Sequence, residues 1–186
     1  MFDDTLPRDL VMIGAVFGAG AFAWAGWAQE GPPRAWVWRA LLGVLSVAGL
    51  ALAGWSGTLA ARNWDGGTAI ATGGRGFTLY LVVFWAEVLV AVVAGLLLAR
   101  HGRSDLLAPL VLLVVGVHFF ALAVVFGQPV LHLAAVLLSA IAVPAALVPP
   151  SAVARSFWCG LLGAPVFLGV GFWSVLRGAS VFAASS

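Results

Sequence analysis

The sequence predicts an all-α integral membrane protein, a bundle of six transmembrane helices joined mostly by short antiparallel hairpins. Apolar residues make up 63% of the 186 residues, whereas a typical globular domain has roughly 45–50% even with glycine counted. Charged residues make up 9%, against about 25% in an average soluble protein. Because so few charges cannot cover a surface that faces water, most of the surface must face lipid.

Six separate stretches are long enough to cross the bilayer, which takes about 20 apolar residues in a helix. The runs are continuous and rich in Leu and Ala, which argues against the alternating pattern of a β-barrel. The first run follows an acidic N-terminus rather than a basic one, so we expect a retained span and not a cleaved signal. The expected spans are 10–28, 36–60, 77–99, 106–126, 130–147 and 157–176, within a single transmembrane domain of residues 1–186.

The connections between these spans carry residues typical of turns. Residues 29–34, 101–104 and 127–129 contain Gly, Pro and polar side chains, and such short links favour antiparallel neighbours. Residues 62–76 form a longer connection with four glycines before Gly76. It separates the first two spans from the last four, and we do not expect it to mark a second domain.

The composition excludes several classes of protein. All nine basic residues are Arg, so chemistry that depends on a lysine amine is excluded. Cys159 is the single cysteine, which excludes thiol relays and cysteine-ligated metals. The arginines are scattered over the loops and form no basic stripe for nucleic acid. We expect no cofactor, no metal site and no nucleic-acid partner, and we expect Cys159 to serve packing.

The expected location is the bacterial cytoplasmic membrane. Five arginines lie on one side of the predicted topology and four on the other, so the excess of positive charge that marks cytoplasmic loops is nearly absent. The acidic N-terminus favours an orientation with both termini outside. The bilayer is the expected partner, together with a second copy of the chain or another membrane protein.

One acidic residue, Glu87, lies within a predicted span, near the middle of residues 77–99. An acidic residue at the centre of a membrane helix costs about 2.5–3.5 kcal/mol on insertion scales, and such residues commonly serve function. The sequence also suggests a partner for Glu87. Arg100 and Asp105 flank the turn between the third and fourth spans; Glu87 precedes Arg100 by thirteen residues, and His118 follows Asp105 by thirteen. In antiparallel neighbours these steps place Glu87 and His118 at the same depth.

A carboxyl group next to an imidazole can share one proton and titrate as a unit. Tyr80 lies two turns before Glu87 and can supply a hydroxyl on the same side. Trp24, Trp85 and Trp173 are deep enough to line a cavity, although interior packing is the favoured interpretation. The alternatives for Glu87 and His118 are a hydrogen bond that ties two helices, worth about 0.6 kcal/mol in membranes, and no contact at all.

Small residues predict where helices approach closely. Gly14 and Gly18 form a small-x-x-x-small face that suits packing within the bundle or between protomers, and Gly95 lies on the face of Glu87. Residues 54–57, Gly-Trp-Ser-Gly, have the form found around the serine of rhomboid proteases. Ser56, however, closes the second predicted span instead of opening a helix, which argues against a protease.

Residues 116–119, Gly-Val-His-Phe, followed by Ala121 and Phe126, resemble a stretch of small uncharacterised bacterial six-span membrane proteins. In those proteins a Glu on the third helix likewise precedes the His-Phe pair. The resemblance covers the third and fourth spans and implies no particular activity.

The favoured function is a transporter or channel for a small solute or ion, with a pathway along Glu87, His118, Tyr80 and Trp85. A non-catalytic auxiliary or scaffold subunit is the first alternative. An intramembrane enzyme acting on a lipid or quinone is the second. The sequence favours a non-enzyme, because catalysis needs more convergent polar groups than the interior supplies, namely Glu87, His118, Tyr80, Ser46 and Ser139.

Overall fold

A computed structural model describes residues 4–149 and 153–185, and within these ranges it contains helices and turns but no β-strand. Six of the helices are long and apolar enough to cross a membrane. The all-α fold with six spans is therefore confirmed. The helices are α1 (Pro7–Trp27), α2 (Trp36–Arg62), α3 (Arg75–Arg100), α4 (Leu107–Phe126), α5 (Val130–Leu147) and α6 (Arg155–Ser185), with single 3₁₀ turns at Ala28–Glu30 and Ser104–Leu106.

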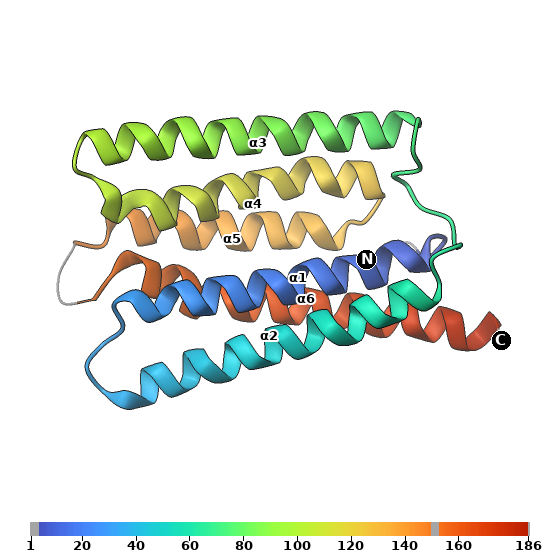
Figure 1. Ribbon diagram of the computed structural model, residues 1–186, viewed down its shortest axis with the longest axis horizontal. Helices are drawn as coiled ribbons and strands as arrows, with labels where there is room; N and C mark the ends of the chain where they lie inside the picture. The colour runs from blue at the N-terminus through green and yellow to red at the C-terminus, as the bar shows by residue number, and fades with distance from the viewer. Residues whose placement is uncertain (1–3, 150–152, 186) are drawn as a thin grey trace.

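The chain runs back and forth along the long axis of the bundle (Figure 1). Both termini lie at one end, here called the terminal end, together with the α2–α3 connection and the α4–α5 turn. The α1–α2 and α3–α4 connections lie at the opposite end, as do the end of α5 and the start of α6. Successive helices are thus antiparallel, as the short turns predict.

Helix α1 lies against α2 and α6 over most of its length. The small-residue face makes this possible, because a Cβ at Gly18 would come within 2.7 Å of the Gly49 carbonyl oxygen on α2. A Cβ at Gly14 would come within 2.7 Å of Ser56 Oγ and 3.1 Å of Val175 Cβ. Gly14 and Gly18 therefore serve packing inside the bundle. Close backbone approach of this kind is a main source of helix association in lipid.

Helix α6 extends to Ser185, well past residue 176, where the hydropathy pattern predicts its end. Arg177 interrupts the apolar run, which explains the shorter prediction. In the fold, the Arg177 guanidinium donates to Asp4 Oδ2 at 2.8 Å. Gly178 also lies close to Val11 and the Pro7 carbonyl oxygen on α1. Contacts with the start of α1 thus stabilise the turns of α6 that follow residue 176.

Helix α3 forms one edge of the bundle (Figure 1). Its extended interface is with α4, and none of its 26 residues, all of which the structure describes, is buried. Gly95 contributes to this interface, because a Cβ there would lie 3.2 Å from Leu107 Cδ1 at the start of α4. Most of the surface of α3 is therefore available to lipid.

Candidate functional site in the cavity between α1, α3 and α4

A partly open cavity of about 420 Å³ lies between α1, α3 and α4. Its deep wall includes Phe17 on α1, Phe119 on α4 and Phe167 on α6, whose ring centroids are 4.8–6.2 Å apart. At the terminal end it reaches the α2–α3 connection at Thr68 and Ile70. The cavity therefore extends from that end of the bundle towards the middle of the membrane.

Glu87 and His118 meet in the wall of this cavity. Glu87 Oε2 on α3 lies 2.9 Å from His118 Nδ1 on α4, and their side chains are 19% and 11% exposed. The equal depth predicted by counting residues is therefore correct. The atoms are within ion-pair distance, but among the described residues His118 Nδ1 has no acceptor that meets hydrogen-bond geometry. The contact is therefore an ion pair by distance alone.

Glu87 lies about 18 Å from the first residue of α3 and about 20 Å from the last, at 1.5 Å per residue. This is the centre of a span, where water is scarce and an ionised group needs a close partner. A ligand that enters the cavity can therefore strongly affect the stability of a charge on Glu87 or His118.

The other two residues of the predicted pathway lie on different sides of α3. Tyr80 lines the cavity, where its ring stacks with that of Phe84 at 6.3 Å between centroids. Trp85 is 63% exposed and lies outside the cavity lining. The prediction that Trp85 packs in the interior or lines a cavity is therefore wrong, because α3 is an edge helix and Trp85 is on its outer face. Trp173 on α6 is likewise exposed, whereas Trp24 on α1 is buried and lines the cavity.

Arg8 and Asp9, which the sequence prediction left among the terminal residues, lie at the terminal end of the cavity. Asp9 is 2% exposed, and its Oδ2 accepts a hydrogen bond of 2.8 Å from the Ala69 backbone N–H. Arg8 donates to the carbonyl oxygens of Trp64 and Gly66, and its guanidinium lies 4.8 Å from the centre of the Trp64 ring. These contacts hold the α2–α3 connection against the cavity.

Sequence reasoning missed Arg8 and Asp9 because it began the first span at residue 10. The available signal was Pro7, since proline is favoured in the first turn of a helix. The structure begins α1 at Pro7. Their partners lie more than fifty residues away in the chain, so no local pattern identified them.

Four ionisable side chains line the cavity in addition to Tyr80, namely Arg8, Asp9, Glu87 and His118. With a neutral imidazole, these groups carry one net negative charge. With a protonated imidazole, they balance. The remaining lining is mainly apolar and aromatic.

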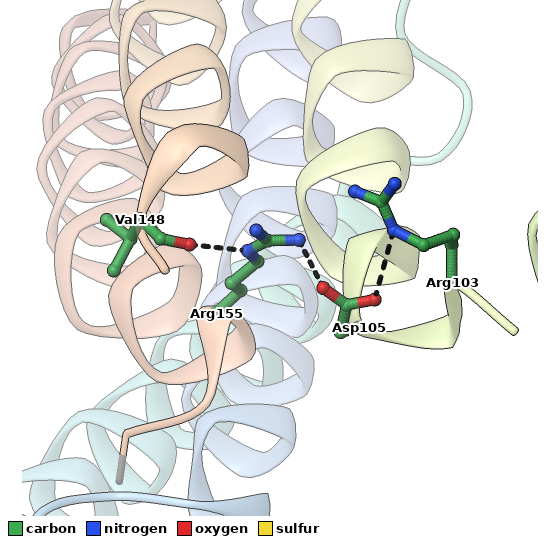
Figure 2. A network of polar contacts seen from close by, with 4 residues as sticks. All are labelled: Arg103, Asp105, Val148 and Arg155. Atoms are coloured by element: carbon green, nitrogen blue, oxygen red, sulfur yellow. Dashed lines mark hydrogen bonds and ion pairs between the residues drawn. The ribbon is translucent and has the colours of Figure 1, made fainter. Parts of the chain in front are cut away.

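A polar network joins the helices at the opposite end of the bundle (Figure 2). The Arg155 guanidinium at the start of α6 pairs with Asp105 and donates to the Val148 carbonyl oxygen at 2.8 Å. Arg103 Nε lies 3.8 Å from Asp105 Oδ1. Arg155 is 7% exposed, and breaking a buried ion pair is costly because it leaves an uncompensated charge. This network therefore ties α4, α5 and α6 together.

The remaining candidate residues lie away from the cavity lining. Ser56 is buried between α1 and α2, which separates it from His118. Cys159 is buried in the apolar core. His101 and His132 are exposed. In the part of the chain that the structure describes, no three His, Cys, Asp or Glu residues form a group that could hold a metal ion.

Comparisons of this chain with protein-family models, with curated proteins and with solved structures gave no match. The function is accordingly inferred from the geometry of the site.

Proposed function

We propose that this membrane protein is a carrier for a small solute and that Glu87 and His118 form its protonatable centre. The observation that carries the proposal is the cavity, which extends from the terminal end of the bundle to this pair at the centre of α3. A cavity of about 420 Å³ falls within the roughly 300–1,000 Å³ of typical small-molecule sites.

The contact between Glu87 and His118 supports coupling between solute and proton. A carboxylate and an imidazole 2.9 Å apart are close enough to pass a proton between them. A solute that binds Glu87 competes with the imidazolium for the same oxygen atoms. Binding therefore favours loss of the proton from His118, and protonation favours release of the solute.

The difference between the two ends of the bundle supports alternating access. The cavity lining includes residues of the terminal end, whereas the network of Asp105, Arg155 and Val148 joins helices at the opposite end. Carriers commonly expose a site near the middle of the membrane to one side at a time. Under this proposal, the described conformation is the one in which Glu87 is reached from the terminal end.

The scaffold alternative is supported by a different observation. Helix α3 has an extended interface with α4 alone among the described helices, and the Glu87–His118 contact belongs to that interface. The pair could therefore serve to attach α3. An enzyme receives less support, because Ser46 and Ser139 lie outside the cavity lining and only a few polar groups converge there.

Proton movement in liposomes distinguishes a carrier from a scaffold. The full chain is reconstituted with the pH dye pyranine inside, and a panel of amino acids, sugars and organic ions is added outside. At least one class of solute should change the internal pH faster than in empty liposomes. Glu87→Gln should abolish that change, because the amide neither ionises nor binds a proton at neutral pH.

Glu30→Gln is the matched control, since Glu30 accepts a hydrogen bond from Ser156 Oγ away from the cavity. This variant should move protons like the unmodified chain. If no solute changes the internal pH, or if Glu87→Gln behaves like the unmodified chain, the carrier proposal is overturned. Loss of thermal stability in Glu87→Gln without any flux to lose would favour the scaffold.

A further inference from the structure

We infer that the solute is a lipophilic organic cation with aromatic groups, which binds in the α1–α3–α4 cavity against Glu87 and displaces a proton from His118. The transport part of this inference rests on the proposed function. The binding part can be tested without transport.

The lining of the cavity favours a large apolar ligand. Aromatic side chains approach it from several helices, among them Phe17 and Trp24 on α1, Phe84 on α3, and Phe119 and Phe126 on α4. Aromatic faces attract cations, and the attraction increases where water is excluded. An inorganic cation would instead need several oxygen ligands to replace its water, and this lining offers few. Aromatic walls around one carboxylate therefore suit an organic cation.

The charges around Glu87 determine the sign of the ligand. His118 faces it from α4, Tyr80 is the other polar residue of α3 in the cavity lining, and Arg8 and Asp9 lie on α1 at the terminal end of the cavity. With neutral His118, the cavity has one net negative charge, which a monovalent cation balances. An anion would add to that net negative charge.

The same charge balance implies that the organic cation exchanges for a proton. When His118 is protonated, the imidazolium already balances Glu87, and a second cation would leave an excess positive charge in an apolar site. Binding of one organic cation therefore accompanies transfer of one proton from the imidazolium to water. No bond other than that N–H bond breaks.

The arrangement of the helices gives such a compound a path from the bilayer. Side chains of α1 and α3 both line the cavity, yet these two helices share no extended interface among the described residues. No residue of α3 is buried along its described length, and among the described helices its extended interface is with α4, so no helix interface closes the side of α3 that faces α1. A cation dissolved in the membrane can therefore enter between α1 and α3.

Binding of two probes of the same shape and opposite charge tests the ligand class. Tetraphenylphosphonium and tetraphenylborate are each measured by equilibrium dialysis against the purified full chain in detergent. Tetraphenylphosphonium should bind saturably and more tightly as pH rises, because protons compete less. Glu87→Gln should weaken its binding about tenfold or more, as expected when a charge-assisted contact is lost. Tetraphenylborate should bind without saturation.

Further variants keep the test decisive if Glu87→Gln folds poorly. His118→Gln should still bind tetraphenylphosphonium but with a weaker dependence on pH. Phe84→Leu removes a lining ring and should weaken binding several-fold. Trp85→Leu, one residue further on the exposed face of α3, should bind like the unmodified chain.

Saturable tetraphenylborate binding, absence of saturable tetraphenylphosphonium binding, or equal effects of Phe84→Leu and Trp85→Leu would each overturn the inference. Failure of this inference differs from failure of the carrier. Suppose that tetraphenylphosphonium does not bind but another solute shows proton exchange that requires Glu87. The inferred ligand class is then wrong, whereas the carrier proposal is supported. If the cation binds in a Glu87-dependent manner but changes the internal pH no faster than in empty liposomes, the carrier proposal is wrong and the ligand class is right.

Discussion

At the scale of single residues, the pair of Glu87 and His118 combines two costly features. A carboxyl group is placed at the centre of a span, and its partner Nδ1 lies 2.9 Å away without hydrogen-bond alignment to any acceptor of the described chain. The contact lies at the α3–α4 interface and in the wall of the cavity, so both attachment and solute binding can depend on it.

Glu87→Gln should therefore alter stability modestly. Polar contacts between membrane helices contribute about 0.6 kcal/mol on average, and the amide keeps the size of the carboxyl side chain. We expect a loss of about 1 kcal/mol or less in the free energy of unfolding in mixed micelles. A loss several times larger would indicate that the pair chiefly attaches α3 to α4.

At the scale of helices, the contact between α1 and α2 depends on glycine. A Cβ at Gly18 would lie within 2.7 Å of the Gly49 carbonyl oxygen and 2.9 Å of Ala53 Cα. These are backbone atoms, so the helices must separate to admit a methyl group. Gly26 on the same helix has open space where its Cβ would be.

Gly18→Ala should destabilise the bundle, whereas Gly26→Ala should leave its stability unchanged or raise it. Inserting a methylene-sized group into a tight interface costs about 1–3 kcal/mol, and alanine is favoured over glycine in a helix by about 1 kcal/mol. Thermal unfolding in detergent measures both variants. Equal melting temperatures would show that α1 and α2 can separate at little cost.

The number of helices could be predicted from the sequence, but their rotation could not. Six continuous apolar runs separated by turn residues predicted six helices, because hydropathy reports the length that lies in lipid. The rotation of each helix about its axis was not predictable, since apolar residues surround the spans on all sides. For that reason Trp85 was expected inside the bundle or along the pathway, and the structure places it on the outside.

At the scale of the whole molecule, the two ends of the bundle differ in construction. The terminal end carries the α2–α3 connection, held by Arg8 and Asp9 next to the cavity. At the opposite end, Asp105 and Arg155 join the starts of α4 and α6 (Figure 2). Under the carrier proposal, exposure of Glu87 to the opposite side requires separation of this network.

Asp105→Asn should weaken the network and favour exposure to the opposite side. Val115→Cys places a thiol in the cavity lining, with Cys159→Ala removing the native thiol. A membrane-impermeant thiol reagent should modify Val115→Cys from the terminal side alone. With Asp105→Asn added, modification should also occur from the opposite side. Unchanged sidedness in that combination would mean that the network does not control access.

The sequence by itself determined the class of protein, the six helices and the depth of Glu87 and His118, because each of these depends on composition and distance along the chain. The tertiary structure decided which faces of the helices meet. It brought Arg8 and Asp9 to the cavity, placed Trp85 outside it and gave Gly14 and Gly18 their partners in α2 and α6. In lipid the hydrophobic effect gives little preference to one helix face over another, so close packing and a few polar contacts make that choice.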